Sequence, residues 1–150
     1  MHPVYVHIKK ELSPFYAEEE ASAMAKWISS DILHLSTLEL YTGKDMNFST
    51  KEWEELEDIL RRLKQREPLQ YILQEASFCG MSFHVEQGVL IPRPETEELV
   101  EWTVSDYRKA GQVRILDIGT GSGCIPVSLA QLLPEAQVSS CDVSTEALRI

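Results

Sequence analysis

The chain has 150 residues, 43% hydrophobic and 25% charged, so it can bury a core and is neither a disordered tail nor a fibre. Its formal net charge of -10 argues against extended contacts with nucleic-acid phosphates, which need Lys and Arg. No uncharged run holds the roughly 20 apolar residues of a membrane-spanning helix, and Met1–Ile8 lacks the order of a secretory signal, so we expect a cytoplasmic protein without membrane contact. Three cysteines without a Cys-x-x-Cys pair predict reduced thiols and no metal site.

The front of the chain has the pattern of a helical bundle. Ser13 followed by Pro14 is typical of a helix start. Apolar residues recur behind it at helical spacing: Ala17, Ala21, Met24, Ala25, Ile28 and Ile32. A shorter helix is expected to stop at Gly43. Residues 49–52 match a capping box, and the stripe of an amphipathic helix follows: Trp53, Leu56, Ile59, Leu60 and Leu63.

The middle of the chain changes to short β-prone runs. They lie at 77–79, 83–85 and 89–91, separated by glycines, and predict a small hairpin. In the segment that follows, a proline stands on each side of Arg93, which makes it stiff and extended. A helix is expected from about Glu95.

The part after residue 110 predicts the strand–loop–helix–strand order of an α/β sheet. We expect a buried strand over 113–118, a glycine loop over 119–123, a helix over 124–133 and a second strand over 136–141. Residues 142–144 would cap another helix. Because two parallel strands cannot bury both faces of a doubly wound sheet, we expect these residues to be the front of a longer protein.

The glycine loop carries the most chemical information. Glycine lets a backbone turn sharply and lets a ligand approach the main chain, so Gly119–Gly123 predicts a bound cofactor. Its spacing is GxGxG, not the GxGxxG of dinucleotide loops, and Asp117 beside it would repel a pyrophosphate. S-adenosylmethionine carries no phosphate and has a net positive charge, so an acid at this place attracts it.

A second acid supports the same cofactor. Asp142 ends the second strand about 20 residues after the loop, where this topology places an acceptor for ribose hydroxyls. One carboxylate accepts hydrogen bonds from both hydroxyls through its two oxygens. Alternatively, Asp142 caps the next helix, a role that Ser144 could also fill.

The motifs resemble those of a known family. LDIGTGSG at 116–123, with CDVS at 141–144, resembles motifs I and II of class I S-adenosylmethionine-dependent methyltransferases. Three further motifs restrict the resemblance to one family within this class: REPLQYI at 66–72, FCGMSFHV at 78–85 and VLIPRPETE at 89–97. In this order they are similar to the PrmC/HemK family, the glutamine N5-methyltransferases of peptide chain release factors.

The resemblance implies an α/β fold in three parts. A helical substrate-recognition domain would comprise residues 1–73 and a β-hairpin linker residues 74–93. Residues 94–150 would be the first half of a Rossmann-like class I methyltransferase sheet, truncated at residue 150.

The resemblance also implies a reaction, a cofactor and a partner. A methyl group would pass from S-adenosylmethionine to the side-chain amide nitrogen of the Gln in the GGQ motif of class I peptide chain release factors, with no direct contact to nucleic acid. Carried over by position, the residues that would bind the cofactor are Asp117, Gly119, Thr120, Gly121, Ser122, Gly123 and Asp142. Those beside the substrate pocket would be Arg93, Pro94, Glu95 and Thr96, unless they form a rigid interdomain hinge.

One family motif does not occur in these residues. Asn-Pro-Pro-Tyr holds the substrate amide in the family, so no catalytic residue is assigned here, and we expect residues 1–150 alone to be inactive. Three alternatives stay open: a methyltransferase acting on a nucleobase amine or another protein, a nicotinamide-dependent oxidoreductase, and a non-catalytic interaction module with a vestigial glycine loop.

Overall fold

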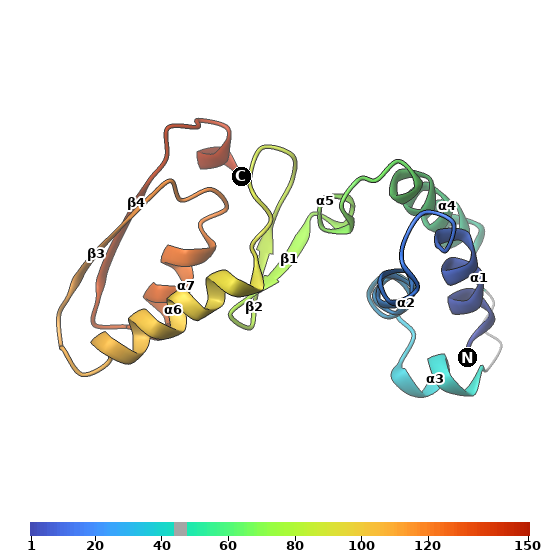
Figure 1. Ribbon diagram of the computed structural model, residues 1–150, viewed down its shortest axis with the longest axis horizontal. Coiled ribbons are helices and arrows are strands. Elements are labelled where there is room, and N and C mark those ends of the chain that lie inside the picture. The colour runs from blue at the N-terminus through green and yellow to red at the C-terminus, as the bar shows by residue number, and fades with distance from the viewer. Residues whose placement is uncertain (44–47) are drawn as a thin grey trace. The chain divides into compact units, whose positions relative to one another are not determined.

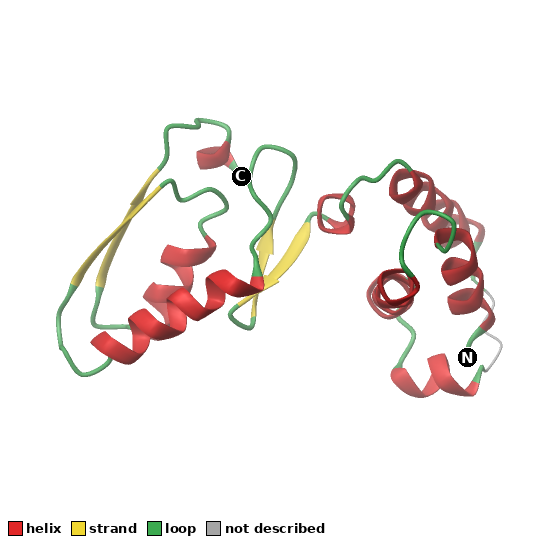
Figure 2. Ribbon diagram, in the orientation of Figure 1, coloured by secondary structure: helices red, strands yellow, loops and turns green. Residues whose placement is uncertain are grey.

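The computed structural model describes residues 1–43 and 48–150 and divides the chain into two compact units, Met1–Leu69 and Gln70–Ile150 (Figure 1). Helices make up the first unit, whereas the second combines helices with strands (Figure 2). The predicted α/β class with a helical front is confirmed. The hairpin belongs to the second unit, and the three-part division at residues 73 and 93 stays a prediction.

The first unit is built on apolar stripes. Its elements are α1 (Pro3–Leu12), α2 (Glu18–Trp27), a π-helical turn (Ile28–Ile32), α3 (Thr37–Thr42) and α4 (Thr50–Lys64). Helix α1 packs against α2 and α4. The fully buried side chains of this unit include Ile8, Leu12, Ala21, Ala25, Ile28, Leu60 and Leu63. Burial of such residues drives folding by roughly 1.5–3 kcal/mol for each large aliphatic side chain.

The predicted helix start at Ser13 is wrong. Ser13 ends α1 instead, because its backbone N–H donates to the carbonyl of Lys9 at 3.0 Å. Helix α1 begins at Pro3, whose ring suits the first helical position, and the His2 side chain accepts from the N–H of Val4. Helix α2 begins only at Glu18.

Two other predicted helix boundaries in this unit, the end of α3 and the start of α4, are confirmed. Gly43 follows α3 in the left-handed conformation, with φ of 68°. The capping box of α4 is formed in both directions: Ser49 Oγ accepts from the N–H of Glu52, and Glu52 Oε2 accepts from the N–H of Ser49 at 2.7 Å.

The second unit contains two separate pairs of strands. After α5 (Leu69–Leu73), which crosses the unit boundary, come β1 (Glu75–Phe78), β2 (Met81–His84), α6 (Pro94–Tyr107), β3 (Arg114–Ile118), α7 (Cys124–Leu132), β4 (Gln137–Cys141) and a 3-10 helix (Ala147–Arg149). Strands β1 and β2 form the predicted hairpin. Strands β3 and β4 pair in parallel, with Ile118 opposite Cys141.

One expectation for the second unit is wrong, and another is confirmed only in part. The run Val89–Ile91 forms no strand; Val89 and Ile91 are instead buried in a cluster with Ala147, and Pro92 has no N–H for a ladder. The helix expected after residues 142–144 is present only as the short 3-10 helix Ala147–Arg149, and the Asp142 carboxylate accepts from the N–H of Gly121 in the glycine loop. Ser144 Oγ accepts from the N–H of Ala147 and caps the short 3-10 helix.

Among the residues that the structure describes, helices cover one side of the β3–β4 pair. Helices α6 and α7 lie on that side, where Ile115 and Val138 pack against the cluster that includes Val100 (Figure 1). On β3, Leu116 and Ile118 are 61% and 76% exposed. In the described ranges, 1–43 and 48–150, we find no helix with the length and apolar character to cross a membrane.

Candidate functional site

The glycine loop lies where the parallel strand pair places it. Strand β3 ends at Ile118, the loop runs from Gly119 to Gly123, and α7 begins at Cys124. Because β4 runs parallel to β3 and ends opposite it, its last residues lie beside the loop. Ligands of α/β sheets bind at this carboxyl edge of the strands.

All three glycines of the loop have positive φ. The values are 82° at Gly119, 53° at Gly121 and 73° at Gly123. An added Cβ would meet nothing within 4 Å at Gly119 or Gly121. The space beside the main chain is therefore open at these two positions, as an approaching ligand requires.

Two residues at the end of β4 hold the loop in place. The carbonyl of Cys141 accepts from the N–H groups of Gly119 and Thr120, at 2.8 and 3.2 Å. Asp142 Oδ2 accepts from the N–H of Gly121 at 2.9 Å, and Asp142 Oδ1 accepts from the N–H of Ser144 at 2.8 Å. The predicted residues Gly121 and Asp142 are thus in direct contact.

These hydrogen bonds favour the charged form of Asp142. The N–H groups of Ser144 and then Gly121 hold the pKa of the Asp142 carboxyl below its ordinary value of 3.8. Asp142 is consequently a carboxylate at neutral pH. Each of its oxygens has two lone pairs, so both retain acceptor capacity beyond these two contacts.

Asp117 and Thr120 carry buried polar atoms without partners. Among the described residues, no hydrogen bond reaches Asp117 Oδ2 or Thr120 Oγ1. A buried polar atom without a partner is costly, by about 1–3 kcal/mol. Both atoms belong to predicted cofactor residues, and a ligand that donates hydrogen bonds or carries positive charge would satisfy Asp117.

The loop also borders a cavity of about 370 Å³. Thr120, Gly121, Ser122 and Gly123 line it, together with residues of α7, β4 and the 3-10 helix. Asp117, Gly119 and Asp142 do not. The cavity therefore marks one flank of the loop rather than the whole set of predicted cofactor residues.

The residues predicted beside the substrate pocket form the start of α6. Arg93 precedes the helix, Pro94 is its first residue, and the N–H of Thr96 donates to the carbonyl of Arg93 at 2.9 Å. Within the described ranges, no hydrogen bond or ion pair joins residues 93–96 to the glycine loop. The structure therefore does not bring residues 93–96 into polar contact with the loop.

The sequence did not indicate two of these features. The backbone carbonyl of Cys141 anchors the loop, and because any residue has such a carbonyl, the sequence gives no signal for this contact. A second cavity, of about 760 Å³, is lined by side chains of α6, among them Glu101, and by Arg108, which follows the helix. Their seven-residue spacing, close to two helical turns, was the available signal.

The described part of the chain holds no group of three or more His, Cys, Asp or Glu side chains that could bind a metal ion. The three cysteines have free thiols, of which Cys124 is buried, Cys79 partly buried and Cys141 exposed. Burial raises the pKa of the Cys79 and Cys124 thiols.

Known proteins resemble the chain along its whole length. Residues 5–73 match the family described as the PrmC N-terminal domain. A protein of Bacteroides thetaiotaomicron named release factor glutamine methyltransferase is 47% identical over 150 residues, which are 100% of this chain and 53% of that protein. Proteins of the same name from Flavobacterium psychrophilum and Chlorobaculum tepidum are 41% identical over 140 residues and 39% identical over 153. These alignments cover 91% and 97% of this chain, and 49% and 52% of the relatives. The chain thus spans about half the length of the curated relatives it matches.

Proposed function

Because this chain belongs to the PrmC family, we propose that it supplies the substrate-recognition and cofactor-loop part of a release factor methyltransferase. The enzyme would use S-adenosylmethionine to methylate the side-chain amide nitrogen of the Gln in the GGQ motif of class I release factors. One observation carries the proposal: a glycine loop tied to Asp142 lies beside a buried oxygen of Asp117 that has no partner among the described residues.

The charges favour S-adenosylmethionine over a dinucleotide. Asp117 lies two residues before the loop, where its carboxylate would repel a pyrophosphate, whereas an acid at the place of Asp142 suits the ribose of either cofactor. When bound, S-adenosylmethionine supplies an electrophilic methyl group on a positively charged sulfur. Its ammonium group would donate to Asp117, and its ribose hydroxyls would donate to the free lone pairs of Asp142.

The main chain of the loop would bind the methionyl part. Glycine at positions 119 and 121 leaves room for this contact, since a Cβ there would meet nothing within 4 Å in the protein itself. Arg93–Thr96 would border the substrate pocket. Pro94, the first residue of α6, restricts the backbone φ at this point and so makes the segment rigid. The remaining interpretation of that segment is a rigid hinge.

The substrate amide needs more than these residues provide. An amide nitrogen is a poor nucleophile because its lone pair is delocalised. Acceptors positioned for its N–H groups, with the nitrogen held in line with the methyl group, would supply the catalysis. In the family this is the role of Asn-Pro-Pro-Tyr, which these 150 residues do not contain. We therefore assign binding and orientation, not catalysis, to this chain.

The helical unit would recognise the release factor. Residues 1–73 would form this domain, residues 74–93 the hairpin linker, and residues 94–150 the beginning of the cofactor domain. The match of residues 5–73 to the PrmC N-terminal domain supports the first boundary.

A chimera tests the proposal. It joins this chain to the C-terminal half of the Bacteroides thetaiotaomicron relative, which is 47% identical over the shared part. We expect the chimera, incubated with S-adenosylmethionine and a class I release factor, to add one methyl group to the GGQ peptide, as mass spectrometry would detect. The intact relative serves as the positive control.

Further arms of this experiment separate the alternatives. The 150-residue chain alone should transfer no methyl group, and a release factor with Ala in place of the GGQ glutamine should stay unmodified. A folded chimera that binds S-adenosylmethionine but methylates RNA instead would favour the nucleobase alternative. Binding of NAD without binding of S-adenosylmethionine would refute the proposed cofactor.

A further inference from the structure

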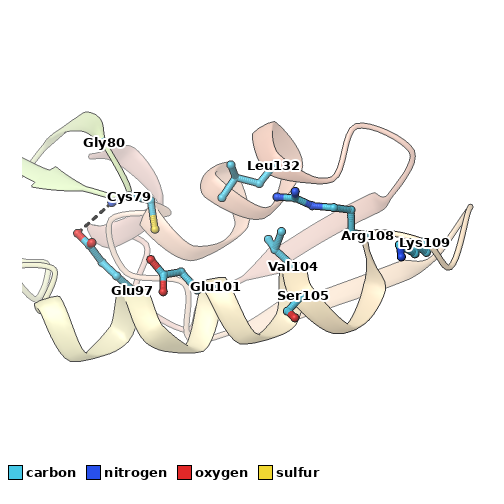
Figure 3. Close-up of a pocket in the computed structure, with 9 residues that line it drawn as sticks. All are labelled: Cys79, Gly80, Glu97, Glu101, Val104, Ser105, Arg108, Lys109 and Leu132. Atoms are coloured by element: carbon cyan, nitrogen blue, oxygen red, sulfur yellow. Dashed lines mark hydrogen bonds between the residues drawn. The ribbon is translucent and has the colours of Figure 1, made fainter.

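A groove of about 760 Å³ lies along α6, apart from the glycine loop. The hairpin turn closes one end of it, and Leu132 of α7 faces α6 across it (Figure 3). Its volume lies within the range of about 300–1,000 Å³ that is usual for ligand pockets. None of its lining residues is a predicted cofactor or substrate residue.

Opposite charges stand towards the two ends of this groove. Glu101 and Arg108 are seven residues apart, about 10 Å along the helix axis. Figure 3 shows both side chains rising from the same side of α6 into the groove. In the described part of the chain, neither has an ion-pair or hydrogen-bonding partner for its side chain. Each charge is therefore available to a ligand.

The neighbouring groups define what else a ligand would meet. Two acids, Glu97 and Glu101, lie at the hairpin end; Glu97 accepts from the backbone N–H of Cys79 at 3.0 Å, whereas Glu101 has no hydrogen bond within the described residues. Between the two charges, Leu132 is 38% exposed and offers an apolar surface, with the buried Val104 beneath the groove (Figure 3). The groove thus presents acids at the hairpin end, an apolar middle, and two bases, Arg108 and Lys109, at the other end.

We propose that this groove binds an extended peptide segment in which a basic and an acidic residue are separated by two residues, at least one of them apolar. A chain in the extended polyproline II conformation advances about 3.1 Å per residue with three residues per turn, so residues three positions apart lie on the same face, about 9 Å from each other, close to the axial spacing of about 10 Å between Glu101 and Arg108. An apolar residue between them would lie against Leu132. The ammonium and α-carboxylate groups of a free amino acid share one carbon and span much less than this spacing.

Titration of the 150-residue chain with short peptides tests this. The probe is acetyl-Arg-Leu-Ala-Glu-amide, followed by NMR through the backbone amide shifts of Gly80 and Val104. The control, acetyl-Leu-Arg-Glu-Ala-amide, has the same composition but adjacent charges. We expect the control to bind at least fivefold more weakly, and the probe to bind at least fivefold more weakly to Glu101→Gln and Arg108→Gln.

Matched variants and a second readout complete the test. Glu98→Gln alters an acid of α6 that does not line the groove, and should bind the probe like the parent chain. Glu101 and Arg108 are exposed, so their variants should keep the parental circular dichroism and thermal unfolding. The probe should also slow alkylation of Cys79 but not of the exposed Cys141. Equal affinity for the two peptides, no effect of either substitution, or no shift at the groove would each overturn the proposal. Because neither S-adenosylmethionine nor the glycine loop takes part, failure here is distinct from failure of the proposed function.

Discussion

Replacing Gly121 by alanine distinguishes two effects. One is the free-energy cost of holding a residue with a side chain in the left-handed conformation, and the other is the loss of space for a ligand beside the main chain. Gly121 has φ of 53°, and an added Cβ would meet nothing within 4 Å in the protein. Its N–H would still donate to Asp142, because the substitution leaves the backbone donor in place. The effect on the free chain should therefore come from the left-handed conformation alone.

The size of this effect follows from the backbone. A left-handed conformation costs an L-residue with a side chain about 1–2 kcal/mol. For a domain the size of residues 70–150, each kcal/mol lowers the melting temperature by about 4–8 °C. Gly111→Ala is the matched control, since Gly111 has φ of 69°, has equally open surroundings and lies outside the site. Both substitutions should destabilise the chain to a similar extent.

Only Gly121→Ala should weaken cofactor binding. Isothermal titration of the chimera with S-adenosylmethionine, well below the melting temperature, should show a loss of affinity of more than about tenfold, or 1.4 kcal/mol, for Gly121→Ala. Gly111→Ala should bind like the unsubstituted chimera. Equal affinity of the two variants would refute the inference that the ligand approaches the main chain at Gly121.

Two further predictions concern the acids of the site. Asp117 Oδ2 has no partner within the described residues, so Asp117→Asn should keep or raise the melting temperature of the chain. The same substitution should weaken S-adenosylmethionine binding by the chimera. A lower melting temperature with unchanged affinity would instead show that the carboxylate stabilises the fold. Because the pKa of Asp142 is lowered below 3.8, its stabilising contribution should be complete above the pKa of the unfolded chain and should disappear as the pH falls through the lower folded-state pKa. The NMR shift of the Gly121 amide should report a midpoint below 3.8 that Asp142→Asn removes, and a midpoint above 3.8 would contradict the hydrogen bonding seen here.

The features that the sequence predicted correctly depend on residues that are neighbours along the chain. The capping box at Ser49 and Glu52 needs only four consecutive residues, and the stop at Gly43 needs only a residue that tolerates positive φ. The β3–loop–α7–β4 order likewise follows from local hydrophobic pattern and glycine spacing. In each case the residue types alone predict the conformation.

Features that depend on distant parts of the chain were missed or misjudged. Val89 and Ile91 have the composition of a strand, but burial against Ala147 takes the place of pairing. Helix α1 was missed for a local reason: Val4, Ile8 and Leu12 recur at a spacing of four residues, but the capping residue is His2, an unusual choice. The hydrogen bond from Gly121 to Asp142 joins residues 21 positions apart, and no local pattern encodes it.

That hydrogen bond bears on the two roles considered for Asp142, helix capping and ribose binding. Capping of the 3-10 helix falls to Ser144, which leaves the Asp142 carboxylate turned towards the loop. There each oxygen uses one lone pair on a backbone N–H and keeps another for a hydroxyl group. The contact that fixes the loop and the contact proposed for the ribose are therefore compatible in one side chain. Since β3, the loop and β4 supply the fixing contacts themselves, the loop is shaped before any ligand arrives, which lowers the entropic cost of binding.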